Sequence, residues 1–537
     1  MTVARWEIVP QDAAGHLWDA IIIGTGAGGA TAGFNLAQLG RSVLFVERGK
    51  LLHRDPTVVK GVPFSRTGDP ETELDHGWWP GGFHFQEEDG AALQPVKPPV
   101  GAGAGGSTAQ FGAVMDRFRP QDFMPRRFFT DIPDASLPEA WPISYEEMIP
   151  FYERAESLYR VRGTQDPLAS TGADLVEPPP PSDREIAVFD ALKAVGLNPY
   201  RMHSAMERVP GCIGCPGMLC PRACRNDAAR MCLYPALECY GAKILSKCRA
   251  IRLEERNGVV ERVICEWDRQ PIALRARVFV LAANAFLTPA LLQRSANERF
   301  PNGLANSSGL VGRNLMLHAN NHLFVRLKEG ARDLGIDMNH GLSLNDFYVY
   351  NGTKLGNIHA HAVTNRDALV MFLAQSYRGL NFLPGRLLSL IASATDSFLR
   401  RSWMMFVAIV EDLPYLANRV TAKPGTEEEI VYTYRYPDEL RYRAQMMSDG
   451  FMSAVAPVLG VRSMQPTGAL NGSHVCGTCR FGDDPRTSVL DRDNRAHDLD
   501  NLFVLDASFF PSSGGINPSL TIVANSLRAS EMIARRL

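Results

Sequence analysis

The chain has 537 residues, of which 45% are hydrophobic, so it can bury a large core and should divide into two closely packed domains. Its formal net charge is −2 and it has no long run of one sign, which argues against binding to nucleic acid or to an anionic membrane surface.

The first twenty residues lack the charged-then-apolar stretch, ending in small residues, that marks a secretory signal. No run of about 18 uncharged apolar residues follows, since the best candidate, around 381–393, is broken by Pro384 and Arg386. We therefore expect a cytoplasmic protein without a membrane span. Export with a partner that carries its own signal stays open.

Residues 19–49 have the pattern of a strand, a glycine turn, a helix and a second strand. The turn holds Gly24, Gly26, Gly28 and Gly29, which would allow a tight turn, close approach of a pyrophosphate and close packing of helix on strand. Glu47 ends the second strand, where a carboxylate can accept hydrogen bonds from ribose hydroxyls. The pattern predicts a dinucleotide site, although it does not separate FAD from NAD, and a glycine turn without a ligand is the alternative.

Later segments should return the chain to this nucleotide-binding domain. Residues 275–292 read as a buried strand, a turn and a helix, and residues 501–511 read as a strand ahead of a helix from Ser519 to Arg536. Between them, residues 314–470 alternate apolar and polar side chains, as in HLFVRL and EIVYTYRY, which is typical of antiparallel sheet. We predict an α/β protein with a discontinuous Rossmann-like domain (1–160, 225–318 and 475–537), a cysteine-rich excursion (161–224) and an α+β, antiparallel-sheet substrate-binding domain (319–474).

The excursion contains four cysteines within thirteen residues. They are Cys212, Cys215, Cys220 and Cys224. Thiolates so close together can bind an iron–sulfur cluster or, less typically, zinc. Reduced cysteines that pack a loop, or a pair of disulfides, are the alternatives.

Several ordered motifs resemble those of the glucose-methanol-choline (GMC) oxidoreductase family, and in particular its bacterial branch of gluconate and glucose dehydrogenase large subunits. The resemblance covers nearly the whole chain. Its carriers are the loop 24–29, Gly105-Gly-Ser-Thr108, Trp141-Pro-Ile-Ser-Tyr-Glu-Glu, Pro150-Phe-Tyr-Glu-Arg-Ala-Glu156, Val280-Leu-Ala-Ala-Asn284 with Thr288-Pro289, Val311-Gly-Arg-Asn-Leu-Met316, Asn418-Arg-Val420, His474-Val-Cys-Gly-Thr478 and Asn517-Pro-Ser-Leu-Thr521. It implies an FAD-binding domain, oxidation of a CH–OH group and an active site beneath the flavin.

The resemblance also implies roles for individual residues. His474 falls where the family has its catalytic histidine, and an imidazole suits a base that accepts the alcohol proton near neutral pH. Asn517 falls at the second position, where an amide can hold the substrate oxygen but cannot titrate. A structural histidine and a turn or helix-capping asparagine are the alternatives. Further contacts to FAD are expected from Gly105, Gly106, Ser107, Thr108, Ala283, Asp506 and Pro518.

One departure from the family concerns the attachment of FAD. Relatives with covalent flavin place a histidine shortly after the paired glycines, whereas this chain has Gln110 near that position. We therefore expect non-covalent FAD.

The branch that it resembles also implies the substrate and the electron-transfer partner. The spacing of Cys215, Cys220 and Cys224 resembles the cluster-bearing segment of the glucose dehydrogenase branch, whose electrons leave for a cytochrome or small-subunit partner. The expected substrate is a sugar, glycoside or polyol. A sterol or long-chain alcohol oxidase is the second prediction. A flavin-binding lyase or a non-catalytic electron-transfer subunit is the third.

Overall fold

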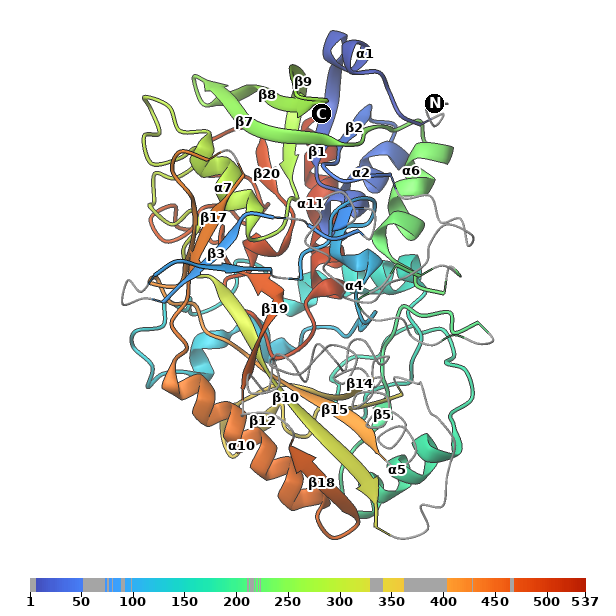
Figure 1. Ribbon diagram of the computed structural model, residues 1–537. Helices are drawn as coiled ribbons and strands as arrows, with labels where there is room; N and C mark the ends of the chain where they lie inside the picture. The colour runs from blue at the N-terminus through green and yellow to red at the C-terminus, as the bar shows by residue number, and fades with distance from the viewer. Residues whose placement is uncertain are drawn as a thin grey trace, which may run out of the picture.

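The computed structural model in Figure 1 shows a parallel sheet with its helices in the upper half of the molecule and an antiparallel sheet in the lower half. It describes residues 6–51, 73–74, 77–79, 81–87, 92–97, 99–209, 212, 217, 219–220, 222, 224–328, 341–361, 403–426, 428–463 and 468–537. Within these ranges, no helix is both long and apolar enough to cross a bilayer.

The upper sheet is built around β1 (Leu17–Ile23), in which Ala20, Ile21 and Ile22 are fully buried. Such an unbroken apolar run suits a strand that is covered on both faces. The strand order is β6–β2–β1–β9–β8–β7, and β20 also pairs with β9. Strands β6, β2, β1, β9 and β20 are parallel, whereas β7 and β8 form an antiparallel extension. The remaining bounds are β2 (Val43–Val46), β6 (Lys243–Leu245), β7 (Cys248–Arg256), β8 (Val259–Trp267), β9 (Gln270–Leu281) and β20 (Leu502–Val504).

Helices from distant parts of the sequence pack together on this sheet. In Figure 1 the C-terminal helix α11 runs beside α2, and the amide of Asn35 on α2 donates to Ser530 Oγ on α11 at 2.9 Å. The hydroxyls of Tyr152 on α4 and Thr521 on α11 lie 2.9 Å apart. The discontinuous Rossmann-like domain expected from the sequence is therefore confirmed. The helices are α1 (Pro10–Gly15), α2 (Ala27–Gln38), α4 (Tyr145–Tyr159), α6 (Tyr234–Cys239), α7 (Leu287–Arg294) and α11 (Ser519–Arg536).

The lower sheet is antiparallel, with the order β18–β10–β15–β14–β11–β5 and with β19 also paired to β10. Apolar residues of α10 (Asp438–Val455) and α5 (Asp183–Ala194) share one core with this sheet, including Phe451, Leu192 and Phe406. The antiparallel substrate-side sheet is thus confirmed. Its strands are β5 (Tyr200–Arg201), β10 (Met316–Leu327), β11 (Leu342–Leu344), β14 (Ile358–His361), β15 (Met404–Val410), β18 (Leu459–Ser463) and β19 (Ala469–Cys476).

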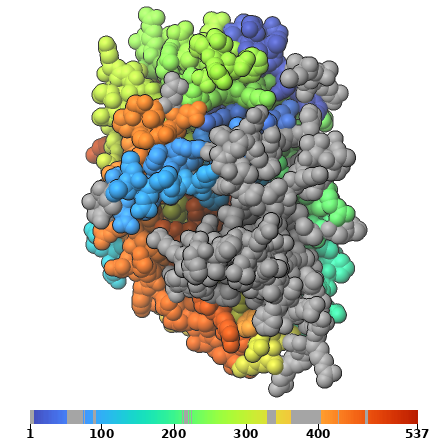
Figure 2. Space-filling view, viewed as in Figure 1, coloured from blue at the N-terminus to red at the C-terminus, as the bar shows by residue number. Residues whose placement is uncertain are grey.

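A small third sheet joins segments that are far apart in the sequence. Its order is β16 (Arg419–Ala422), β17 (Ile430–Thr433), β3 (Phe83–Gln86) and β4 (Gln94–Val96), and β17 runs parallel to β3. Figure 2 shows the blue residues of β3 and β4 beside the orange residues of this sheet on one face of the molecule. The EIVYTYRY stretch therefore pairs with N-terminal residues and not with the lower sheet. The expected domain ranges stay a prediction, and this sheet joins segments from two of them.

Candidate active site

One continuous cavity runs from the carboxyl ends of the parallel strands to the antiparallel sheet. In α/β proteins, ligands bind outside the carboxyl ends of such strands. Its walls include the glycine turn after β1, the residue after β2, the loop after β9 and side chains of β10, β14, β15 and β19. Ten of the twelve expected cofactor residues line it: Gly24, Gly26, Gly28, Glu47, Gly106, Ser107, Thr108, Ala283, Asp506 and Pro518. Both expected catalytic residues, His474 and Asn517, line the same cavity.

The glycines of the first turn differ in what a side chain would meet. Gly24 has φ +99°, and a Cβ there would lie 2.4 Å from the carbonyl oxygen of Ala282. A Cβ on Gly28 would lie 1.8 Å from the carbonyl oxygen of Leu505, whereas a Cβ on Gly26 meets nothing within 4 Å. Gly26 therefore leaves open space at the start of α2, where backbone N–H groups favour a phosphate.

The two remaining expected cofactor residues lie behind the cavity wall. A Cβ on Gly29 would press on the Gly24 carbonyl at 2.1 Å, and Gly105, at φ +88°, packs against Ala229. Both glycines allow close packing of the backbone and do not line the cavity.

Alanine at Gly26 and at Gly28 should therefore have different consequences. Gly28→Ala should destabilise or unfold the domain, because the new methyl group has no room against Leu505. Gly26→Ala should fold normally but release its nucleotide about tenfold more readily, because the methyl group occupies space at the helix N-terminus. Thermal unfolding and the flavin-to-protein ratio measure the two effects. Equal unfolding temperatures and equal flavin-to-protein ratios in the two variants would contradict the different roles of Gly26 and Gly28.

Two buried carboxylates line the cavity near the glycine turn. Glu47 accepts hydrogen bonds from the backbone N–H groups of Thr25, Gly49 and Gly103 and from the Thr25 hydroxyl, at 2.7–3.1 Å. It therefore ties three loops together at the cavity edge. Asp506 accepts from the backbone of Asn284 and Ser508 and from the hydroxyls of Thr288 and Ser508. Burial raises the pKa of Asp506, and these donors oppose that rise.

At the other end of the cavity, His474 on β19 contacts two polar side chains. Its Nε2 lies 3.3 Å from the amide nitrogen of Asn517, and its Nδ1 lies 2.8 Å from Nδ1 of His318 on β10. His318 is fully buried, and its Nε2 lies 2.9 Å from the carbonyl oxygen of Gly514. Asn517 Oδ1 is buried and has no hydrogen-bond partner in the described part of the chain. The expected catalytic pair is thus brought together, with an acceptor left over for a ligand.

Burial keeps both histidines neutral. It lowers the pKa of His318 to about 4, against the raising effect of the carbonyls of Gly514 and Ser513. The pKa of His474 lies well below its ordinary value because of burial first and then the neighbouring His318 and His359. A neutral imidazole can accept a proton near pH 7.

The rest of this end of the cavity is rich in polar side chains. Asn320, His322, His359, Asn471 and Ser473 line it together with the apolar Val407, Ile409 and Val475. The side-chain oxygen of Asn320 is buried and has no hydrogen-bond partner among the described residues.

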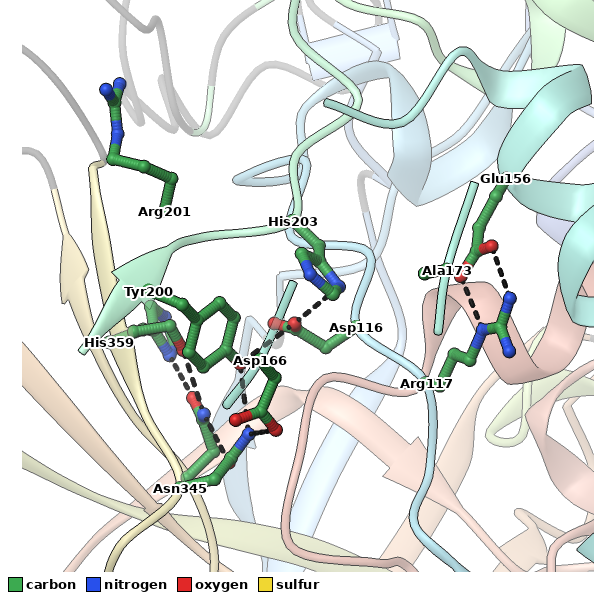
Figure 3. Close-up of polar contacts among 12 residues, drawn as sticks. Asp116, Arg117, Glu156, Asp166, Ala173, Tyr200, Arg201, His203, Asn345 and His359 are labelled. Atoms are coloured by element: carbon green, nitrogen blue, oxygen red, sulfur yellow. Dashed lines mark hydrogen bonds and ion pairs between the residues drawn. The ribbon is translucent and has the colours of Figure 1, made fainter. Parts of the chain in front are cut away.

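A buried polar network lies behind His359. His359 Nδ1 is 3.0 Å from Asn357 Oδ1, and the Asn357 amide donates to Asn345 at 2.9 Å. Asn345 donates to Tyr200, and Tyr200 donates to Asp116, which is 3.1 Å from His203, as Figure 3 shows. Burial raises the pKa of Asp116 to about 6 despite the nearby His203. The network fixes the orientation of His359 at the cavity wall.

The cysteine-rich segment reaches the cavity at Gly217, one of its described residues. Gly217 lines the cavity, and its N–H donates to the carbonyl of Gln110 at 2.8 Å. Burial and then the thiols of Cys220 and Cys212 raise the pKa of Cys224 to about 12. Among the described residues, no three His, Cys, Asp or Glu side chains are placed to hold a metal ion. Cys215 lies outside the described residues.

Comparison with known proteins decides the family. Two family models described as GMC oxidoreductase match more than half of the chain, at residues 145–320 and 418–526. The chain is 30% identical to 6'''-hydroxyparomomycin C oxidase of Streptomyces lividus, over 98% of this chain and 92% of that protein. The chain belongs to the GMC oxidoreductase family. It is accordingly an FAD-dependent oxidoreductase that acts on CH–OH donors.

Other GMC oxidoreductases are similar over nearly their whole length. Paromamine 6'-oxidase of Streptomyces fradiae is 29% identical over 98% of this chain and 93% of its own. The fructose dehydrogenase large subunit of Gluconobacter japonicus is 26% identical over 97% of this chain and 98% of its own. The structure of a pyridoxine 4-oxidase from Mesorbium loti has the same fold, with a TM-score of 0.63, 17% identity and 97% and 99% of the two chains covered.

The two neutral histidines should make the stability of this GMC oxidoreductase fall in acid. Between pH 6.5 and about 4, His318 binds a proton in the unfolded chain but not in the folded one, so the free energy of unfolding decreases as pH falls. Over this range His318 alone accounts for about 3 kcal/mol. Asp116, whose pKa is raised, changes stability in the opposite direction. Urea unfolding of wild type and His318→Asn isolates the effect, and an unchanged acid slope in the variant would contradict it.

Sequence reasoning missed three histidines of this site. His318 and His322 lie on β10, and His359 lies on β14. Residues 318, 320 and 322 are His, Asn and His, and alternate residues of a strand share one face. This polar face on an otherwise apolar strand is the sequence signal that could have indicated that these side chains line a site.

Proposed function

We propose that this protein oxidises a CH–OH group of a sugar, glycoside or related polyol to a carbonyl, with His474 as the base that takes the hydroxyl proton. The observation that carries the proposal is that His474 and Asn517 lie 3.3 Å apart in the same cavity as the glycine turn. FAD held by the glycine turn and the other residues of this cavity would supply the hydride acceptor. Loss of hydride from an alcohol leaves a protonated carbonyl unless a nearby base removes the proton, and a neutral imidazole is suited to this role.

We assign the substrate oxygen to Asn517 and His474 together. A hydroxyl group can donate its proton to the imidazole and accept a hydrogen bond from the Asn517 amide. The buried side-chain oxygen of Asn517, which has no partner among the described residues, can accept a hydrogen bond from a second hydroxyl of the same substrate. A neighbouring pair of hydroxyls is a common feature of sugars and polyols, which supports this substrate class.

The wall around His474 supports the same choice. Among the described residues, the buried side-chain oxygens of Asn320 and Asn517 have no hydrogen-bond partner. A substrate rich in hydroxyl groups can donate to both oxygens, whereas a sterol or a long-chain alcohol would leave them unsatisfied at a cost of about 1–3 kcal/mol each. The names of three relatives, two aminoglycoside oxidases and a fructose dehydrogenase subunit, point to carbohydrate-like substrates as well. A long-chain-alcohol oxidase of Arabidopsis thaliana is also related, at 22% identity.

Anaerobic mixing of the holoenzyme with a substrate panel tests the proposal. The panel holds neutral sugars, polyols, amino-sugar glycosides, a long-chain alcohol and a sterol, and bleaching of the flavin band is measured. Bleaching by members of the first three classes supports the proposal. Bleaching by the long-chain alcohol or the sterol alone would contradict the proposal and favour a sterol or long-chain alcohol oxidase. No bleaching by any member of the panel would also contradict the proposed substrate class.

We further propose that FAD is held without a covalent bond. Gln110 and Phe111 line the cavity just after the Gly106–Ala109 turn, and neither side chain is a usual point of flavin attachment. Acid precipitation should release all yellow colour into the supernatant, where its absorbance is measured. Colour that stays with the precipitated protein would contradict the proposal.

An iron–sulfur cluster on Cys212, Cys215, Cys220 and Cys224, with a cytochrome or small-subunit partner, stays a prediction. The Cys224 N–H donates to Sγ of Cys220 at 3.3 Å, and Gly217 and Gln110 contact each other at the cavity wall. These contacts support a redox group near the flavin. Iron analysis and electron paramagnetic resonance of anaerobically prepared protein test it. Protein that carries FAD but no iron would favour packed, reduced thiols.

A further inference from the structure

His318 is a buried histidine that no motif assigned to the reaction, yet it contacts the proposed base directly. It lies on β10 where the pairing register with β19 shifts, between Met316 and His318. The planes of the His318 and His474 rings are at 86°, with centroids 4.9 Å apart. Because both Nδ1 atoms are 2.8 Å apart, one must donate a proton and the other must accept it.

The backbone decides which ring donates. A carbonyl oxygen can only accept, so the Nε2 of His318, at 2.9 Å from Gly514 O and 3.3 Å from Ser513 O, must carry the proton. His318 is neutral, since burial lowers its pKa to about 4. A neutral imidazole has one ring proton, so the Nδ1 of His318 holds a lone pair.

The same reasoning fixes His474. Its Nδ1 must carry the proton that is donated to His318, and its neutral ring then has a lone pair on Nε2. Nε2 is the atom that faces the Asn517 amide, at 3.3 Å. The lone pair is therefore on the side of the ring where a substrate hydroxyl would lie.

The carbonyls that hold His318 are themselves fixed by packing. Gly514 has φ +65°, and a Cβ there would lie 2.7 Å from the ring of Phe118. The N–H of the next residue, Gly515, donates to the Tyr348 hydroxyl at 3.1 Å. This loop keeps its acceptors in place independently of any ligand.

We propose that His318 is a positioning residue that holds His474 in the Nδ1–H tautomer, so that Nε2 is always the proton acceptor. This inference rests on the proposed role of His474. In the opposite tautomer, Nε2 would carry a proton and could not act as the base. When Nε2 of His474 takes the alcohol proton, the ring becomes an imidazolium. Its Nδ1–H still donates to Nδ1 of His318, so this hydrogen bond is kept. In serine proteases, a base held in the wrong tautomer lowers kcat about 10⁴-fold.

Two amide substitutions separate positioning from packing. The Oδ1 of asparagine in His318→Asn can take the place of Nδ1 and keep an acceptor for His474. Glutamine in His318→Gln reaches the place of Nε2 instead, so it keeps a contact to Gly514 and lacks that acceptor. Anaerobic flavin reduction should stay within about tenfold of wild type in His318→Asn and fall about 100-fold or more in His318→Gln, with KM unchanged.

The controls make each outcome decisive. Flavin content and thermal unfolding are measured for both variants, and equal losses of rate at equal flavin content would overturn the proposal. A fully active His318→Gln would also overturn it, whereas a fully active His474→Ala would instead remove the proposed base itself. Neutron diffraction of the wild-type holoenzyme needs no variant: hydrogen on Nδ1 of His474 supports the proposal, and hydrogen on Nε2 alone overturns it.

Discussion

His474→Ala should keep its FAD and lose most of its substrate-driven flavin reduction. A positioned general base contributes about 10²–10⁴-fold to the rate, so a fall of that size is expected at saturating substrate. The flavin should stay bound because His474 is one side chain of the β19 wall, whereas the glycine turn expected to hold the nucleotide is formed by other residues of the cavity. Stopped-flow absorbance of the flavin band under nitrogen measures the rate directly.

His497→Ala is the matched control for this experiment. His497 contacts Ser488 at 2.8 Å and does not line the cavity, so its loss should leave the rate of flavin reduction unchanged. A His474→Ala protein whose flavin bleaches as fast as that of wild type would rule out the proposed base.

The pH dependence of wild type is a separate test. Because the pKa of His474 is well below its ordinary value, the rate of flavin reduction should stay constant as pH falls through 6.5.

The nucleotide half of the fold was predictable because its signals are local. The glycine spacing, the apolar run of β1 and the carboxylate of Glu47 all lie within one βαβ unit, and the structure places all three around one cavity. His474 and Asn517 are 43 residues apart, and only the resemblance to the family joined them. Their contact requires β19 and the start of α11 to meet, which no periodicity encodes.

What escaped prediction depends on contacts between distant strands. His318 and His474 are 156 residues apart and meet because β10 pairs with β19. Likewise, β17 pairs with β3 across more than 300 residues, so the alternating pattern of residues 430–433 indicated a strand without naming its partner. Alternation determines which side chains share a face, whereas the choice of neighbour depends on the packing of the whole chain.

Lys354→Met should be strongly destabilising. Lys354 Nζ lies 2.7 Å from Asp122 and 2.6 Å from Glu411, and all three side chains are fully buried. Methionine preserves much of the volume but removes the ammonium group that the two buried carboxylates share, and breaking a buried ion pair in this way costs about 3–5 kcal/mol. Lys423→Met, at a partly exposed pair with Glu429, is the control and should change the urea midpoint little.

The same ion cluster should affect the reaction through the loop that holds His318. Asp122 accepts a hydrogen bond from Tyr348 at 2.7 Å, and Tyr348 in turn accepts one from the N–H of Gly515, next to the carbonyl that fixes His318. At a low temperature where the Lys354→Met protein stays folded with its FAD, substrate should therefore reduce the flavin more slowly than in wild type.

Adding Glu411→Gln removes one of the two buried carboxylates, so the double variant should recover part of the stability that Lys354→Met loses. Equal stability of the single and double variants would show that charge repulsion is not the cause.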